Sequence, residues 1–217
     1  MYNIKKPVLE KYFSKARLEK YRNISDENID FIELYQLNMK CSEKFFTALI
    51  QFEVLLRNSI NQQLVENFGE KWFDCESLNF LDKQRDMIQE VKLKLSSDKK
   101  KISSCNITSN LNFGFWTSLF SPNCEKILWR KSLYKIFYNV ASKPSRGKVR
   151  ERLEKFRTLR NRISHCECII HFPLKKYYSQ LIEMLSWIDS DIAKWLDEEI
   201  NFSSINFEKT KHALRPK

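Results

Sequence analysis

The feature that most constrains this chain is the rarity of residues that break helices. Among its 217 residues there are only 3 Gly and 5 Pro, and neither type occurs between Val8 and Phe68. Glycine and proline are the least favourable residues in a helix interior, so long stretches without them favour helical structure. No pair of strands is evident from the pattern of apolar and polar residues. The sequence therefore predicts an all-α protein.

The size and composition of the chain suit a folded domain rather than a disordered segment. Hydrophobic residues make up 42% of it, and 16 Phe and 5 Trp are enough for a substantial core. We expect a single domain over residues 1–200 and a loosely held tail over residues 201–217.

Helix signals in the first third of the chain predict one short helix and two longer ones. Pro7 suits the first turn of a helix that runs to about Tyr21. The polar residues 25–28 are typical of a helix start, and apolar residues at helical spacing continue from there to Gly69, a helix-stop residue. We expect this stretch to form two helices, divided near residues 38–42.

Further helices are predicted in the rest of the chain, with caps at Thr108 and Ser145. A long helical region should follow Pro173, with Trp195 among its inward-facing residues. The other expected helices cover about 81–95, 108–121, 122–137 and 146–165, with exposed loops over 96–106 and 142–148.

The cysteines and the hydropathy of the chain indicate a cytoplasmic protein. The six Cys are scattered, and none is spaced with His as in a zinc site. The first residues lack the apolar core of a signal peptide, and no apolar run reaches the roughly 18 residues of a membrane span. We therefore expect reduced cysteines that pack as small hydrophobes, and neither a metal nor another cofactor.

The stretch LRNRISHCE, residues 159–167, places an Arg, an Asn and one of only 3 His at a predicted helix end. Asn161 and His165 are four residues apart, so a helix puts them on one face, with Arg157 one turn earlier. Arg160 and His165 are five apart and diverge by about 140° around a regular helix. A site that needs both is best built at the helix end or across a dimer of two chains.

These residue types suit the cleavage of RNA by internal attack. That reaction deprotonates a 2′-hydroxyl and protonates a leaving 5′-oxygen, and histidine, with an ordinary pKa of about 6.5, can serve either step. Arginine stabilises the negative charge of the transition state, and asparagine can orient the histidine or hold a phosphate oxygen. The same residues could also bind a phosphate without turnover. A further alternative is a helix-end histidine bonded to a carbonyl, beside an arginine in a surface ion pair.

Positive charge is concentrated around this motif. The formal net charge is +11, and residues 125–162 contain thirteen Lys and Arg against three Glu, an excess of ten. A local basic surface attracts polyanions in a salt-dependent manner, which favours an RNA partner. The alternative is a solvated face that only improves solubility. The candidate RNA-binding residues are Arg146, Lys148, Arg150, Arg152, Arg157 and Arg162.

The motif and its surroundings resemble one known family. LRNRISHCE resembles the Arg-Asn-x-x-x-His signature of HEPN-domain proteins. It looks most like the Abi-like (abortive infection) family of bacterial antiphage proteins, whose usual form is close to Leu-Arg-Asn-Arg-Ile-Ala-His-His-Glu. The resemblance extends, in matching order, over about residues 10–197. It includes FEVLLRNSI (52–60), LNFGFWTSLFS (111–121), EKILWRKSLYKIF (125–137) and LIEMLSWIDSDIAKWL (181–196).

The resemblance implies an all-helical, HEPN-type bundle with additional N-terminal and C-terminal helices. For active members it also implies metal-independent endoribonuclease activity. At matching positions, Arg160 and His165 would be the catalytic pair and Asn161 a polar helper. The sequence departs from the family at Cys166, where the family has a second His, and retains the following Glu167 as a supporting residue.

A second Leu-Arg-Asn occurs earlier, in LRNSINQQL, where Gln62 stands at the position that matches His165. Without a histidine this copy cannot be a second catalytic centre. In HEPN bundles the long early helix packs beside the motif helix, so the resemblance implies that Arg57 and Asn58 support the active-site wall. Glu53 would pair with Arg57 one turn earlier. The alternative is a structural buried ion pair.

Several functions remain open from the sequence. The leading interpretation is a HEPN endoribonuclease of an antiphage or toxin-type system. The alternatives are a non-catalytic RNA-binding protein that holds a regulatory RNA, and a protein-interaction subunit of a defence system. HEPN domains commonly pair, and Arg160 and His165 diverge on a regular helix, so the resemblance implies a homodimer. A neutralising RNA or protein could bind this dimer. No membrane association is expected. Phe113, Phe115 and Trp116 are expected in the core rather than stacked on bases.

Overall fold

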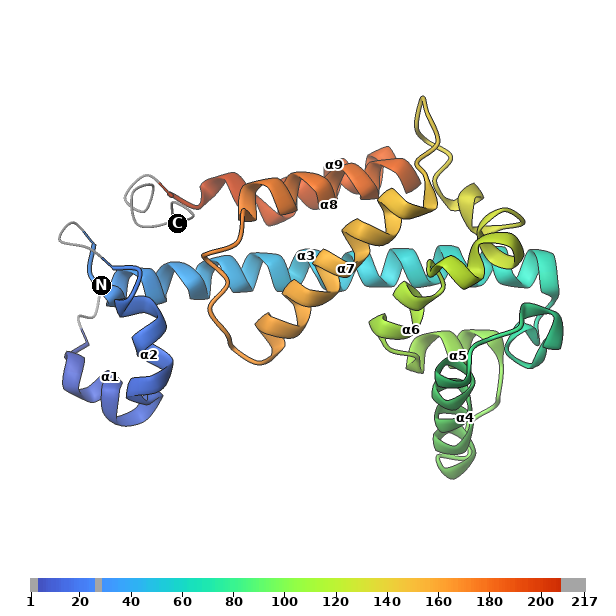
Figure 1. Cartoon of the computed structure of the whole chain (residues 1–217), viewed down its shortest axis with the longest axis horizontal. Coiled ribbons are helices and arrows are strands. Elements are labelled where there is room, and N and C mark those ends of the chain that lie inside the picture. Colours follow the sequence, from blue (N-terminus) through green and yellow to red (C-terminus); the bar gives the residue numbers. More distant parts are fainter. Residues whose placement is uncertain (1–3, 26–28, 208–217) are drawn as a thin grey trace.

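The computed structural model describes residues 4–25 and 29–207. Every regular element in these ranges is helical, which confirms the all-α class. The longest is α3 (Phe31–Phe68), a continuous helix of 38 residues that forms the axis of the molecule (Figure 1). Within the same ranges, no helix is both long and apolar enough to cross a membrane.

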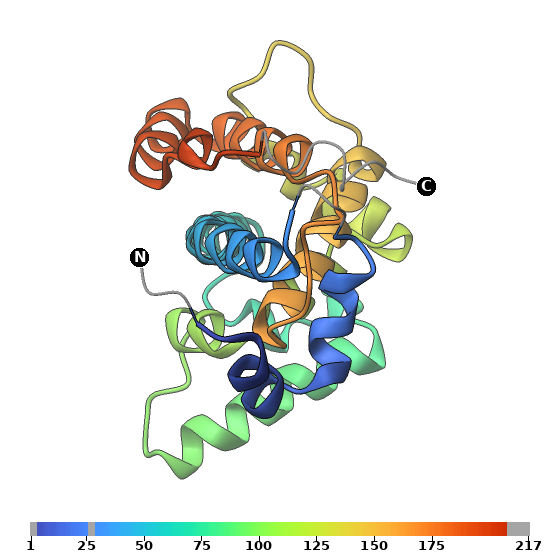
Figure 2. The ribbon, with the colours of Figure 1, turned by 90° about the vertical axis from the view of Figure 1, so that its left-hand side faces the viewer.

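The other long helices pack around α3. The motif helix α7 (Arg146–Ser164) crosses it (Figure 1). The buried Phe156 of α7 lies 5.5 Å from Phe52 of α3, ring centre to ring centre. The C-terminal helices α8 (Leu174–Ile188) and α9 (Ser190–Ile200) lie along one side of α3. Seen from the end of α3, α8 and α9 lie in the upper half of the molecule, opposite α4 (Asp82–Ser97) in the lower half (Figure 2).

Helix α3 starts and stops at recognisable residues. The Asp30 side chain caps its first turn by accepting a hydrogen bond of 3.1 Å from the Ile32 amide. Gly69 ends it with φ of 82°, a left-handed conformation that glycine adopts without strain, so the predicted stop is confirmed. The helix start predicted at residues 25–28 is wrong, because α3 begins at Phe31. Residues 26–28 themselves lie outside the described ranges.

The break predicted near residues 38–42 is absent. Asn38 and Cys41 are buried inside the continuous helix, and the ladder of backbone hydrogen bonds passes through them. No glycine or proline interrupts the helix there, and its apolar face keeps contact with neighbouring helices along its length.

The N-terminal region contains two helices where one was predicted. Pro7 does lie in the first turn of α1 (Lys6–Phe13), but Ser14 takes a φ of 65° and divides α1 from α2 (Lys15–Arg22). The turn lets α2 fold back on α3, where the rings of Tyr21 and Tyr35 meet edge to face at 5.2 Å.

A second group of helices lies beside the C-terminal half of α3. It comprises α4 (Asp82–Ser97), close to the predicted bounds, α5 (Ser104–Asn110) and α6 (Phe113–Ser118). Thr108 does not cap a helix; it is buried within α5, which Ser103 caps, while Asn112 caps α6. As predicted, the aromatic residues of α6 belong to the core: Phe113, Phe115 and Trp116 are all buried.

The regular helix predicted for residues 122–137 is wrong. Pro122–Cys124 and Leu133–Ile136 form 3-10 turns, separated by a π-helical turn over Glu125–Trp129. Ser132, with φ of −140°, interrupts any helix between them. The irregular path places apolar residues from several sides of the segment in the core, which one helix face could not do: Leu128, Trp129, Leu133, Ile136 and Phe137 are all buried.

The bounds of α7 follow the sequence prediction. The Ser145 hydroxyl caps its start by accepting a hydrogen bond of 3.2 Å from the Lys148 amide, and the helix ends at Ser164. The predicted apolar stripe of Leu153, Phe156, Leu159 and Ile163 is buried.

The C-terminal part differs from the prediction in two respects. Asp189 divides the expected long helix by accepting hydrogen bonds of 2.9 Å from two amides at the start of α9. Trp195 then faces outward, 55% exposed. In the expected tail, Phe202 and Ile205 are buried, and Phe202 stacks on Tyr178 at 4.4 Å; residues 208–217 lie outside the described ranges.

Candidate active site

A pocket of about 490 Å³ lies beside the motif helix, between α7, α4 and α6. Arg160 and Asn161 line it together with Arg157, so the structure brings three of the predicted site residues to one wall. The opposite walls come from segments that sequence spacing does not connect to the motif. Their residues include Leu81, Lys83, Gln84, Met87, Asn112, Phe113, Thr117 and Ser118.

Arg160 is half-buried between this pocket and α3. In the described part of the chain, its guanidinium has no hydrogen bond or ion pair. Across the helix interface, the half-buried Glu53 carboxyl interacts electrostatically with the Arg160 guanidinium. Burial raises the pKa of Glu53, and the positive charges of Arg160 and Arg57 oppose that rise. Arg160 thus keeps its hydrogen-bond donors available for a ligand.

His165 occupies the position that ends α7. Its backbone amide donates to the Asn161 carbonyl at 3.0 Å, while its imidazole is exposed and has no hydrogen-bond partner among residues 4–25 and 29–207. It lies outside the pocket that Arg160 and Asn161 line. The three motif residues therefore share the end of one helix, but only two of them share a cavity.

The helix end itself has a specific geometry. Cys166 takes a left-handed φ of 53°, its amide donates to Ile163 at 2.9 Å, and the Glu167 amide donates to Arg162 at 2.8 Å. This pair of bonds defines a Schellman motif, in which the left-handed position is usually glycine. Cys166, where the sequence departs from the family that the motif resembles, is thus the left-handed residue of the helix stop.

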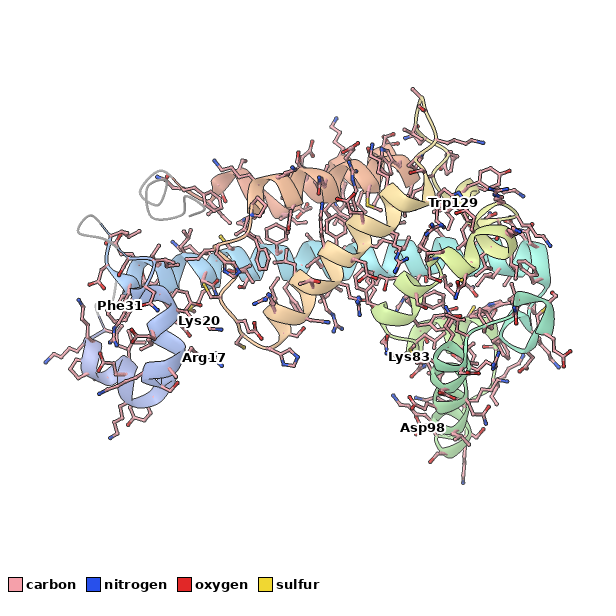
Figure 3. All side chains as sticks on the ribbon, viewed as in Figure 1. Arg17, Lys20, Phe31, Lys83, Asp98 and Trp129 are labelled. Atoms are coloured by element: carbon pink, nitrogen blue, oxygen red, sulfur yellow. The ribbon has the colours of Figure 1, made fainter. Side chains whose placement is uncertain are left out.

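Two residues that the sequence reasoning missed hold the segment after His165. Asn38, on α3 and only 5% exposed, accepts a hydrogen bond of 2.7 Å from the buried Ile169 amide, and its amide group lies 3.4 Å from the Glu167 carbonyl oxygen. Arg17, labelled on α2 in Figure 3, donates to the Cys166 carbonyl at 3.1 Å. The sequence signal for Asn38 is a polar residue on an otherwise apolar helix face, at the position where the sequence predicts a break instead.

The charged residues of the motif also pair with one another. Arg162 donates to Glu167 at 2.8 Å and lies over the Phe172 ring at 5.3 Å. Arg157 pairs with Glu154 at 2.6 Å on the pocket wall. Glu167 therefore supports the helix end through Arg162, whose charge is partly engaged.

Two of the predicted RNA-binding residues are engaged with other segments of the chain. Arg152 is 7% exposed; it pairs with Glu183 at 2.8 Å and lies over the Trp187 ring at 4.6 Å, which ties α7 to α8. Arg146 pairs with Glu125 and donates to the Phe120 carbonyl at 2.6 Å. Both side chains are held inward because their charges meet partners from other segments.

Lys148 and Arg150 remain as basic groups with access to solvent. Lys148 is exposed, with its ammonium 5.3 Å from the Trp187 ring, and Arg150 is half-buried. In the described ranges, neither side chain has an ion pair with a carboxylate.

The earlier Leu-Arg-Asn stretch lies on α3, and only part of it reaches the motif helix. Arg57 donates to the Ser109 carbonyl at 3.4 Å, and its Nε is buried without a partner. The predicted ion pair between Glu53 and Arg57 is absent, as no contact within 4 Å joins them. Asn58 is exposed and does not line the pocket. Glu53, which lies just before this stretch, has a carboxyl that interacts with the charge of Arg160.

Within the described residues, no group of three or more His, Cys, Asp or Glu side chains is placed to hold a metal ion. All six cysteines are free. Comparison of the chain with known protein families, with characterised proteins and with solved structures gave no match.

Proposed function

We propose that this chain is a HEPN-type endoribonuclease of the Abi-like kind, which cleaves RNA by internal attack of a 2′-hydroxyl and needs no metal ion for that step. The observation that carries the proposal is the placement of Arg160 and Asn161 on one pocket wall, with His165 ending the same helix one turn later. The resemblance of the motif to that family supports it.

Each motif residue has a role that its surroundings support. His165, whose imidazole is exposed and has no hydrogen-bond partner in the described part of the chain, takes the proton from the 2′-hydroxyl or delivers one to the leaving 5′-oxygen. Arg160, with unused donors, stabilises the negative charge on the non-bridging oxygens, and Asn161 holds a phosphate oxygen. The 2′-oxygen attacks phosphorus and the 5′-oxygen leaves, so the products carry a 2′,3′-cyclic phosphate and a 5′-hydroxyl.

The active unit in this proposal is a homodimer with the two motif helices facing each other. Internal attack uses one base and one acid, and each chain places a single histidine at its motif. His165 also lies outside the pocket that Arg160 lines, at the helix end, where a facing second chain would bring its own His165 to the same phosphate. Mixing inactive Arg160→Ala chains with inactive His165→Ala chains should restore some cleavage. A fully active enzyme that stays monomeric with RNA bound contradicts the dimer.

One observation favours a second candidate, an RNA-binding protein without turnover. Cys166 stands where the related family has another histidine, and its left-handed backbone belongs to the helix stop. Under this alternative, His165→Ala keeps both RNA affinity and the cellular phenotype.

The decisive experiment incubates the purified protein with labelled RNA and EDTA. We expect cleavage that continues in the chelator, leaves cyclic phosphate ends and spares DNA, which lacks the attacking hydroxyl. His165→Ala should abolish it, whereas His171→Ala, at an exposed histidine six residues later, should not. Complete inhibition by EDTA that a divalent ion reverses, or equal loss in both variants, contradicts the mechanism.

This activity implies a cellular role and location. A nuclease of this type would act in the cytoplasm, where it would cut RNA and slow growth during phage infection. Uncontrolled RNA cleavage is harmful to the host, so we infer a neutralising RNA or protein partner.

A further inference from the structure

The pocket beside α7 extends past the motif residues to walls that the cleavage chemistry does not use. Lys83 and Met87 come from α4, and Asn112 and Phe113 from the start of α6. We propose that this pocket holds one nucleotide of the RNA strand, next to the phosphodiester that is cut. The inference rests on the proposed nuclease function and assigns its substrate-binding subsite.

The charges of the pocket match a phosphate-bearing ligand. Lys83, Arg157 and Arg160 line it, against a single carboxylate, Glu154. Glu154 is paired with Arg157, which leaves Lys83 and Arg160 as two cations without ion pairs in the described part of the chain. Two unpaired cations on one cavity attract a polyanionic strand, because each can neutralise a phosphate.

The size and the apolar walls match a nucleobase. A volume of about 490 Å³ lies within the range of about 300–1,000 Å³ found for small-ligand pockets. Leu81, Met87 and Phe113 supply apolar surface, and a methionine thioether adapts well to the flat face of an aromatic ring. The cavity therefore combines an apolar wall for a base with cations for its phosphates.

Most polar side chains that line the pocket already make hydrogen bonds within the protein. The side-chain nitrogen of Asn112 is a donor that can bind the base. Gln84 accepts from the Leu81 amide at 2.9 Å and donates to Ser118 at 2.8 Å. The side-chain oxygen of Asn112 (Oδ1) accepts from the Phe115 amide at 3.0 Å, but its side-chain nitrogen (Nδ2) has only a long contact of 3.9 Å to the Met87 sulfur. That nitrogen remains available to an acceptor on the edge of a base.

The position of the pocket fits the cleavage site. Asn161 on its wall and His165 beyond it lie four residues apart on one face of α7, about 6 Å along the helix axis. A strand whose base sits in the pocket therefore leaves it past Arg160 towards His165, where the scissile phosphate would lie.

Two charge reversals on one helix test the inference. Lys83 lies at the end of α4 nearer α6, with Asp98 beyond the other end (Figure 3). Lys94 is an exposed lysine of the same helix outside the pocket, so Lys94→Glu changes the net charge equally. Met87→Trp fills the cavity without changing charge. The probe is a fluorescent 2′-O-methyl RNA, which binds but lacks the attacking hydroxyl, and its Kd is measured by anisotropy.

We expect Lys83→Glu and Met87→Trp to weaken binding about tenfold, and Lys94→Glu to change it less than about twofold. Equal effects of the two charge reversals, or wild-type affinity in Met87→Trp, overturn the pocket assignment. Cleavage of unmodified RNA is scored separately with wild-type protein and His165→Ala. If wild-type protein cleaves RNA but the pocket variants bind RNA as the wild type does, only this inference is overturned. If the pocket variants weaken RNA binding but the wild-type protein does not cleave, only the proposed nuclease function is overturned.

Discussion

Replacement of Asn38 by alanine should destabilise the protein through one buried hydrogen bond. The Asn38 side chain accepts from the Ile169 amide at 2.7 Å, and both groups are buried. Without it, that amide is left unpaired away from water, which costs about 1–3 kcal/mol. The longer contact to the Glu167 carbonyl, at 3.4 Å, adds at most about 0.5 kcal/mol.

An opposing effect must be subtracted before the measurement is interpreted. Alanine is a better helix former than asparagine, by up to about 0.7 kcal/mol, and Asn38 lies inside a helix. Asn58→Ala measures this gain directly, because Asn58 is an exposed residue of the same helix. The difference between the two variants should therefore be about 2 kcal/mol, a sizeable part of a typical total of about 5–15 kcal/mol.

Urea denaturation of both variants and hydrogen exchange of the Ile169 amide provide the assay. We expect a lower midpoint for Asn38→Ala at an unchanged slope, together with faster exchange at Ile169. Equal stabilities of the two variants with unchanged protection of Ile169 would refute the idea that Asn38 holds the segment after the motif.

Three further outcomes follow from the same structure. Cys166→Gly should stabilise the protein by about 0.5–1 kcal/mol in thermal melts, because glycine removes the strain of the left-handed residue at the helix stop and its own entropy cost offsets only part of the gain, while Cys166→Ala should change little. Glu53→Gln should stabilise the protein at neutral pH and lose this advantage in acid. Burial raises the pKa of Glu53 in the folded state, so the contribution of Glu53 to folding stability is complete at low pH, where it is protonated. That contribution is lost as pH rises through the raised pKa. The reverse trend with pH would contradict the burial argument. Reversing Lys148 and Arg150 to Glu should weaken RNA binding and reduce its salt dependence without loss of stability, whereas Arg152→Glu should lower the melting temperature because it places a like charge beside Glu183.

The helices with strong local signals were predictable from neighbouring residues. Ser145 and Gly69 act at helix ends through their own hydroxyl and backbone, and the stripe from Leu153 to Ile163 follows from helical spacing alone. The misplaced boundaries share a different cause. Ser14 and Asp189 divide helices whose local sequence could have continued, because α2 and α9 turn to pack on their neighbours.

The candidate site divides in the same way. The motif order places Arg160, Asn161 and His165 at one helix end, since five residues of helix span little more than one turn. The pocket beside them exists only because α6 packs against both α7 and α4, which brings Lys83 and Met87 to Arg160 from more than seventy positions away.

Which basic residues are available was likewise decided by packing. The sequence does not distinguish Arg150 from Arg152, because both lie in the same segment rich in positive charge. Arg152 is buried because Glu183 and Trp187 of α8 face it, and Arg150 has no such partner in the described structure. The sequence alone determined the helical class, the position of the motif and its chemical types, because these depend on residues within a turn or two of one another. The cavity, the Asn38 contact and the loss of Arg146 and Arg152 from the exposed surface depended on residues far apart in the chain, and only the tertiary structure decided them.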